Sequence, residues 1–214
     1  MNNRRFISII WMFTALLFST CDMKESNRLK IDLDTAAIDL LFYDYNNGYV
    51  PGAALLIIEN GNIIYSKSFG MANLEDGAAV ASNTNFRLAS VTKQFTALCI
   101  MILKSRGELH YDRTLKDIFP SFPEYGNAIT LRHLMNHTSG LVDYEDLIPD
   151  DAAEQVSDLD VLIMMMNLNS TNFTPGSQFS YSNTGYALLA MVVEEVSGTG
   201  FGEFLHENIF APLG

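Results

Sequence analysis

Residues 86–98 read FRLASVTKQFTAL and open a helix with a serine at its start and a lysine one turn later. Residues three apart on a helix share a face, so the amine of Lys93 can approach the hydroxyl of Ser90. A serine hydroxyl becomes a nucleophile when a base takes its proton, and burial or neighbouring charge can make a lysine that base. The stretch therefore predicts either a nucleophile with its proton partner or a helix-capping serine beside a solvated lysine.

The S-x-x-K spacing alone does not separate these interpretations. Sixteen serines and six lysines in 214 residues give about 0.45 occurrences by chance. A second element, FTPGSQFSYSNTGYALL at 173–189, places Tyr181 and Asn183 on a turn before a helix. A phenol near a serine and a lysine can relay a proton, and an asparagine amide can hold the lysine and bind a substrate carbonyl. The two elements together favour the catalytic interpretation.

With these motifs the sequence resembles the serine hydrolases related to class C β-lactamases, penicillin-binding DD-peptidases and their esterase relatives. The segments ITLRHLMNHTSGL at 129–141, VSGTGFGEF at 196–204 and IFAPLG at 209–214 follow in the family's order. The resemblance implies that Ser90 is the acylated nucleophile, Lys93 its proton partner, Tyr181 the general acid/base and Asn183 a substrate-positioning and lysine-holding group. It implies no cofactor, and a β-lactam, a D-Ala-D-Ala-type peptide or a small ester as acyl donor.

The fold class expected is α+β, with a helical region packed on an antiparallel sheet. Two strand-like runs flank Asn60-Gly61, a pair suited to a tight hairpin. Helices are predicted from Asp34 to Asn47, over Ser90–Arg106, over Thr130–His137 and over Thr184–Val196. The apolar face expected for the Ser90–Arg106 helix consists of Val91, Phe95, Leu98, Cys99, Ile102 and Leu103.

The sequence departs from the family pattern after Asn183, where neither K-T-G nor H-x-G follows. The family's domain normally continues for well over a hundred residues past the position of Gly214. We therefore expect residues 34–214 to be the N-terminal part of a serine hydrolase domain, with only the early hairpin of its sheet. The alternative is a non-catalytic remnant, or a protein that binds cell-wall peptide without turnover.

Composition and the first residues indicate where the protein acts. The formal charge of −12, with no basic run beyond the first residues, argues against nucleic acid as a partner. Residues 1–20 have the features of a signal peptide, followed by Cys21 and a polar tether at 21–33. LLFSTC resembles a bacterial lipoprotein signal; a plain secretory signal and an uncleaved anchor are the alternatives. Each places the domain outside the cytoplasm, at the bacterial cell envelope, with a small-molecule or peptidoglycan-peptide substrate.

Other reactive side chains have plainer explanations. Cys99 lies in an apolar stretch and is expected to be a buried free thiol. His133 and His137 stand four apart, as zinc ligands do, but no glutamate follows His133, and a structural turn is preferred to a metal site. Residues 142–172 carry no motif, and the three methionines at 164–166 are expected to pack under a loop or to form a substrate wall.

Overall fold

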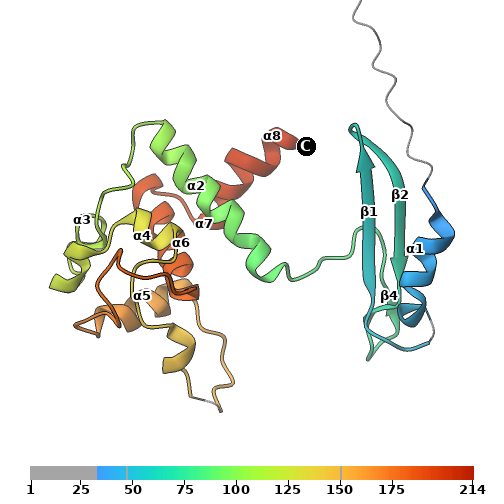
Figure 1. The fold of residues 1–214 in the computed structure, drawn as a ribbon, viewed down its shortest axis with the longest axis horizontal. Coiled ribbons are helices and arrows are strands. Elements are labelled where there is room, and N and C mark those ends of the chain that lie inside the picture. Colours follow the sequence, from blue (N-terminus) through green and yellow to red (C-terminus); the bar gives the residue numbers. More distant parts are fainter. Residues whose placement is uncertain (1–32, 47, 150) are drawn as a thin grey trace, which may run out of the picture. The chain divides into compact units, whose positions relative to one another are not determined.

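The computed structural model describes residues 33–46, 48–149 and 151–214 (Figure 1). Its contacts divide the chain into a unit that ends at Asn85 and a unit that runs from Phe86 to Gly214, and each is considered by itself. The predicted signal peptide, Cys21 and almost all of the predicted tether lie outside the described residues.

The first unit contains the predicted hairpin. Strands β1 (Ala53–Glu59) and β2 (Asn62–Phe69) pair antiparallel around a two-residue turn. Asn60 has φ 51° and Gly61 has φ 79°, the positive values that a tight turn of this kind requires. The Asn-Gly prediction is therefore confirmed. A second short sheet, which the sequence did not indicate, pairs β3 (Met71–Asn73) with β4 (Ala78–Ala79).

Helix α1 (Thr35–Leu41) lies beside the hairpin in this unit (Figure 1). Asp34, where the predicted helix begins, caps it by accepting a hydrogen bond from the Ala37 amide at 2.9 Å. The α-helix ends earlier than Asn47, and a 3-10 turn η1 (Tyr43–Tyr45) follows it. Asp39 of α1 accepts a 2.5 Å hydrogen bond from the Tyr65 hydroxyl of β2, which joins the helix to the sheet.

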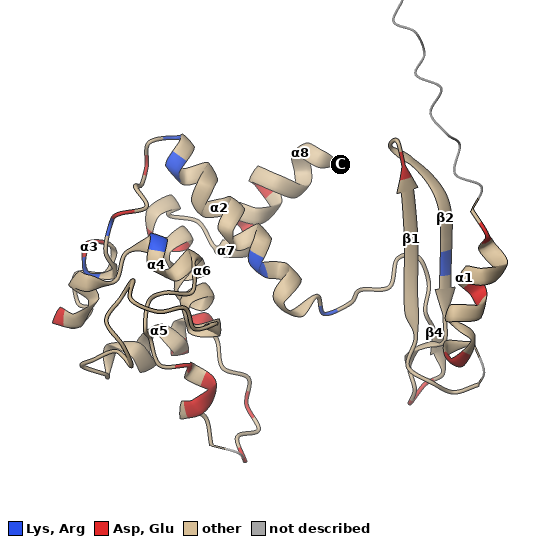
Figure 2. Cartoon of the chain, viewed as in Figure 1, with Lys and Arg blue, Asp and Glu red and all other residues tan. Residues whose placement is uncertain are grey.

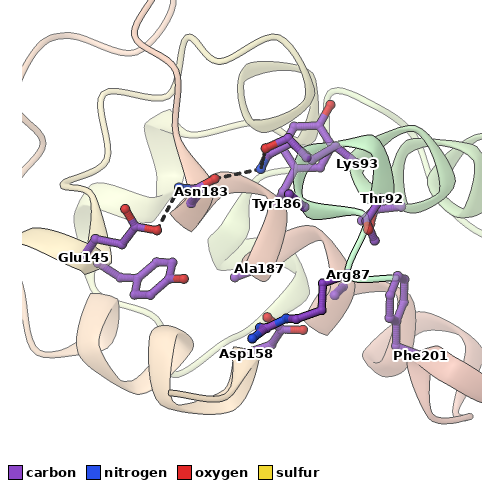
Figure 3. Close-up of a pocket in the computed structure, with 14 residues that line it drawn as sticks. Arg87, Thr92, Lys93, Glu145, Asp158, Asn183, Tyr186, Ala187 and Phe201 are labelled. Carbon is purple, nitrogen blue, oxygen red and sulfur yellow. Dashed lines mark hydrogen bonds between the residues drawn. The ribbon is translucent and has the colours of Figure 1, made fainter. Parts of the chain in front are cut away.

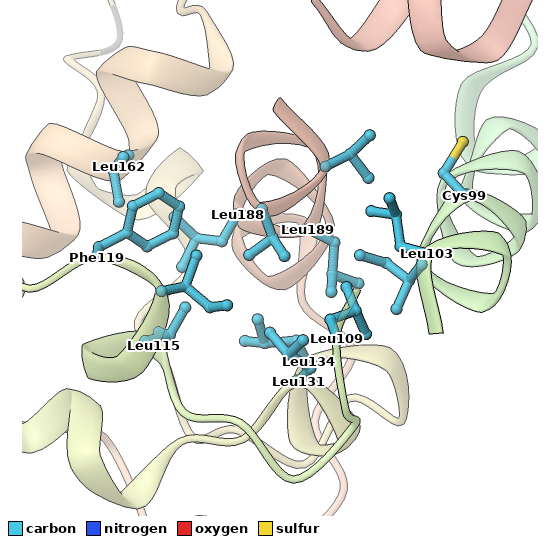
Figure 4. Close-up of a cluster of buried hydrophobic side chains, with 14 of the residues drawn as sticks. Cys99, Leu103, Leu109, Leu115, Phe119, Leu131, Leu134, Leu162, Leu188 and Leu189 are labelled. Carbon is cyan, nitrogen blue, oxygen red and sulfur yellow. The ribbon is translucent and has the colours of Figure 1, made fainter. Parts of the chain in front are cut away.

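The second unit is helical and has one hydrophobic core. Its α-helices are α2 (Lys93–Ser105), α3 (Leu115–Ile118), α4 (Leu131–Met135), α5 (Asp158–Met166), α6 (Asn183–Ser197), α7 (Phe201–Leu205) and α8 (Ala211–Leu213). Single turns η2 (Ala89–Thr92), η3 (Glu124–Ala128), η4 (Tyr144–Leu147) and η5 (His206–Phe210) connect them. Helix α6 supplies the centre of the core, where Leu188 and Leu189 are fully buried against Leu103 of α2 and Leu134 of α4 (Figure 4).

Helix α2 begins later than predicted, and its buried face matches the prediction only in part. Ser90 lies in the 3-10 turn η2, and the α-helix starts at Lys93. Val91 and Leu98, expected in the core, are 55% and 39% exposed. Each residue of an α-helix advances by about 100°, so Leu98 points about 140° away from the buried Leu103. Cys99 and Leu103 are buried as predicted, and Ile100 and Thr96, which were not predicted, are buried with them.

The predicted helices at 130 and 184 are confirmed with adjusted ends. Thr130 caps α4 by accepting from the His133 amide, while His133 Nδ1 accepts from the Thr130 amide. This helix stops at Met135 because His137 adopts φ 57°, which breaks the helical backbone. Helix α6 runs one residue further at each end, and Gly198 closes it at φ 72°, a left-handed conformation that glycine adopts freely.

The stretch without a motif contains helix α5, which was not predicted. Ser157 and Asp160 cap it reciprocally, each side chain accepting from the other's backbone amide. The three methionines lie on this helix, where Met165 is fully buried and the other two pack against the same core. A serine followed three residues later by an acidic residue and an apolar run is a recognisable helix start, and SDLD at 157–160 carried that signal.

The distribution of charge and the hydropathy of the helices bear on where the protein acts. Figure 2 shows acidic residues on both units, including the turn η4, in keeping with the net charge of −12. Among residues 33–46, 48–149 and 151–214, none of the helices combines the length and hydropathy needed to cross a bilayer.

Candidate active site

Three of the predicted side chains meet at the start of α2. The Ser90 Oγ lies 2.5 Å from the Tyr181 Oη, a hydrogen bond between residues 91 positions apart in the sequence. The Lys93 Nζ donates to the same Ser90 Oγ at 3.3 Å. One hydroxyl therefore contacts both a phenol and an amine, either of which can exchange its proton.

The backbone before the serine is in an unusual conformation. Ala89 has φ 46°, a left-handed value that residues with a Cβ adopt at an energetic cost. Such strain persists where the surrounding structure holds it, and it is common next to reactive groups. Here it turns the chain immediately before Ser90.

Tyr181 reaches Ser90 because the segment before α6 is fastened to the turn after α4. The Ser180 amide donates to the His137 carbonyl at 2.9 Å, and the Ser182 amide donates to the His137 Nδ1 at 3.1 Å. The imidazole of His137 also stacks on the Tyr181 ring, with centroids 4.5 Å apart and planes 27° apart. Ser182 itself caps α6 by accepting from the Gly185 amide. The predicted structural turn at HTSGL thus positions the phenol.

Asn183 also binds the amine of Lys93 that contacts Ser90. Its Oδ1 accepts from the Lys93 Nζ at 2.7 Å. The Lys93 Nζ also lies 4.9 Å from the centroid of the Tyr181 ring and 5.5 Å from that of Tyr186, within the range of a cation–π contact. The lysine is therefore fixed by contacts with two residues of α6 and with Tyr181.

One member of this network was not predicted from the sequence. The Asn183 Nδ2 donates to the Glu145 Oε1 at 3.0 Å, so Glu145, Asn183 and Lys93 form a hydrogen-bonded row (Figure 3). Glu145 lies on η4, in the stretch that carries no motif. A glutamate there has no local pattern that would distinguish it from other surface acids.

The environment lowers the pKa of two groups, which favours the charged form of Tyr181 and the neutral form of His137. Lys93, followed by Ser90, lowers the pKa of the Tyr181 phenol below its ordinary value of 10.0, because both stabilise the phenolate. Burial, followed by the nearby Lys93, lowers the pKa of His137 below 6.5. The His137 Nδ1 is already occupied as an acceptor, so a neutral imidazole fits this position.

The lowered pKa of His137 predicts a stability change with pH. Below about pH 6.5 the unfolded chain binds the proton more readily than the folded chain, so the free energy of unfolding should fall as the pH decreases through this region. Urea unfolding at intervals between about pH 5 and 7.5 measures the slope. His137→Asn, which tolerates positive φ and does not titrate, should have a shallower slope, whereas His110→Asn on the surface should keep that of the wild type. Equal slopes in all three proteins would contradict the assignment.

A cavity of about 440 Å³ opens beside these groups. Its lining includes Ser90, and Figure 3 shows Lys93, Asn183 and Glu145 along one side. Figure 3 shows Arg87, Asp158 and Phe201 on the other side, away from the lysine. The nucleophile candidate therefore borders a space in which an acyl donor could lie, lined by charged groups of both signs.

The thiol of Cys99 and the imidazoles of His133 and His137 lie where they contribute to the fold. Cys99 is a buried free thiol, as predicted, and burial raises its pKa to about 11, which disfavours the reactive thiolate. His133 and His137 each use Nδ1 to accept from a backbone amide, at 3.3 and 3.1 Å. Within the described part of the chain, no cluster of three or more potential metal ligands occurs.

Comparison with known proteins places the chain in a family. The beta-lactamase family model matches residues 37–214. The chain is 37% identical over 180 residues to penicillin-binding protein 4* of Bacillus subtilis, an alignment that covers 83% of this chain and 40% of that protein.

Solved structures agree with this match. A penicillin-binding protein homologue from Pyrococcus abyssi has a TM-score of 0.72 and 29% identity, over 85% of this chain and 43% of that one. A D-amino acid amidase from Ochrobactrum anthropi has a TM-score of 0.71 and 27% identity, over 85% of this chain and 50% of that one. The chain thus spans about 40% of the curated relative's length and up to half of these structures. It belongs to the beta-lactamase family, the serine hydrolases of the β-lactamase and DD-peptidase type that act through an acyl-enzyme.

Proposed function

We propose that this protein is a serine acyl-transfer enzyme in which Ser90 forms the acyl-enzyme. The observation that carries the proposal is the pair of contacts at the Ser90 Oγ, 2.5 Å from the Tyr181 Oη and 3.3 Å from the Lys93 Nζ. These distances lie within or close to the range needed for direct proton transfer. The family's chemistry and this geometry support the same assignment of roles.

In the acylation step, the Ser90 Oγ attacks the carbonyl carbon of the acyl donor while its proton passes to the neutral amine of Lys93. The bond from the carbonyl carbon to the leaving group then breaks, and Tyr181 gives its phenolic proton to that group. The ammonium of Lys93 returns a proton to the phenolate of Tyr181, which restores both side chains. Water attacks the acyl-Ser90 ester in the second half of the cycle, with the same groups acting in reverse.

The acyl donor proposed is a β-lactam, a D-Ala-D-Ala-type peptide or a small ester. The relative named penicillin-binding protein 4* supports a β-lactam, and the amidase structures add amides of amino acids to the compounds worth testing. Asn183 would bind the donor's carbonyl with the part of its amide that the lysine leaves free. No step of this chemistry needs a cofactor.

Incubation with a fluorophosphonate or a fluorescent penicillin, followed by mass spectrometry, tests the proposal. We expect one adduct per chain, located by fragmentation on the peptide that contains Ser90. Because a fluorophosphonate adduct also persists on an active enzyme, turnover is measured separately, as hydrolysis of an activated ester. Binding of a cell-wall peptide with no adduct and no hydrolysis would indicate the alternative function. Folded protein that acquires no adduct from either reagent would contradict the proposal for this chain.

We also propose that the protein is exported and that Cys21 carries a lipid anchor at the bacterial cell envelope. The apolar run and the cysteine at residue 21 support this location. Cells grown with labelled palmitate should yield labelled protein, and Cys21→Ser should remove the label. A mature protein that begins at another residue and carries no label would indicate a plain secretory signal instead.

A further inference from the structure

We propose that Glu145 is a positioning residue that fixes the orientation of the Asn183 amide and thereby keeps the lone pair of Lys93 available to Ser90. The inference rests on the proposed function, because it concerns how Lys93 remains able to accept the proton of Ser90. Its starting point is the row of hydrogen bonds from the Glu145 carboxylate through the Asn183 amide to the Lys93 amine.

The turn η4, which carries Glu145, is fastened to the first residues of α6. The Asp143 carboxylate accepts two backbone hydrogen bonds. Its Oδ1 accepts from the backbone N–H of Glu145 at 3.3 Å, and its Oδ2 accepts from the backbone N–H of Asn183 at 3.4 Å. The fully buried Thr184 accepts from the Tyr144 amide at 2.8 Å and donates to the Val142 carbonyl at 2.9 Å. The hydrogen bonds of the Asp143 and Thr184 side chains to backbone groups therefore fix the backbone of Glu145 relative to that of Asn183. The side chain of Glu145 is exposed to solvent.

Hydrogen-bonding capacity determines which way the amide between them points. An ionised carboxylate only accepts hydrogen bonds and an ammonium only donates them. An asparagine side chain accepts at Oδ1 and donates at Nδ2. With Glu145 on one side and the Lys93 ammonium on the other, only one orientation satisfies both: Nδ2 towards Glu145 and Oδ1 towards Lys93.

The orientation matters most when Lys93 is neutral. A neutral amine has one lone pair, which must face the Ser90 hydroxyl if it is to receive the proton. Without Glu145, the Asn183 amide could rotate by half a turn and donate from Nδ2 into that lone pair. With Glu145 present, the same rotation would place the Oδ1 against a carboxylate, so two acceptors would face each other. Glu145 therefore opposes the arrangement that would block the base.

Three variants separate this role from a purely structural one. Glu145→Ala removes the acceptor, and we expect its rate of adduct formation with fluorophosphonate to fall about 10-fold, the effect of one hydrogen bond. Glu145→Gln can present either an oxygen or an NH2 group to Asn183, so it permits both orientations of that amide and should retain only part of the rate. Asp146→Ala removes the same charge from the same turn, without touching the hydrogen bonds of the row, and should react as the wild type does. Urea unfolding of all three checks that the fold is retained.

A second measurement observes the amide itself without requiring catalysis. In NMR spectra, one Nδ2 proton of Asn183, assigned by its absence from Asn183→Ala, should be shifted downfield in the wild type. The shift should be lost in Glu145→Ala. If the wild type forms no adduct, the proposed function fails while the NMR result still decides the orientation. The inference is overturned by an unchanged Asn183 signal in Glu145→Ala or by a wild-type rate in that variant.

Discussion

Replacement of Ser90 by alanine is expected to abolish the covalent adduct completely. Alanine has no Oγ, so no bond to phosphorus or to the carbonyl carbon can form, whatever the state of Lys93 and Tyr181. Where a substrate is turned over, the rate should fall by about 10⁴- to 10⁶-fold, as expected for loss of a nucleophile. Intact-mass spectrometry measures the first effect, and steady-state hydrolysis of an activated ester measures the second.

The stability of this variant should change little. Ser90 is exposed on η2, and substitutions at exposed positions usually alter the free energy of unfolding by no more than about 0.5 kcal/mol. Ser105→Ala is the matched control, since Ser105 lies at the far end of α2 and donates to the Ile102 carbonyl. It should acquire the adduct at the wild-type rate. An adduct of undiminished yield in Ser90→Ala would assign the nucleophile to a different residue.

Tyr181→Phe is expected to lower turnover by about 10²- to 10⁴-fold if the phenol transfers protons. The change removes only the Oη, which lies 2.5 Å from the Ser90 Oγ. The ring would still stack on His137, so the segment before α6 should keep its position. Because the side chain is 48% exposed, the loss of one hydroxyl should leave folding nearly unaffected. Burst kinetics with a chromogenic ester would show whether acylation, deacylation or both are slowed.

Tyr125→Phe provides the comparison for this variant. Its hydroxyl donates to the Met165 carbonyl at 2.6 Å, outside the cavity, so its removal tests the loss of a tyrosine hydroxyl without touching Ser90. We expect wild-type turnover with a modest decrease in the free energy of unfolding. If Tyr181→Phe also hydrolyses substrate at the wild-type rate, Tyr181 has no part in proton transfer, and Lys93 remains as the sole proton partner.

The sequence by itself determined the features that depend on neighbouring residues. Asn60-Gly61 specified the hairpin turn, because few other pairs adopt two successive positive φ values. Thr130 and Gly198 marked helix ends through their capping chemistry. The three-residue spacing of Ser90 and Lys93 brings their side chains within one helical turn of each other without any contact from distant segments.

Tertiary structure decided which of these local features meet. Tyr181 contacts Ser90 from 91 positions further along the sequence, and Asn183 contacts Lys93 from 90 positions further along. Neither secondary-structure propensity nor hydrophobic periodicity can predict contacts over such sequence separations. These residues meet because α2, α4 and α6 bury their apolar faces in one core, which brings the start of α2 close to the start of α6. The same packing selected the buried face of α2 and placed Glu145 beside Asn183. Local sequence thus specified the reactive groups, while burial of a shared core assembled them.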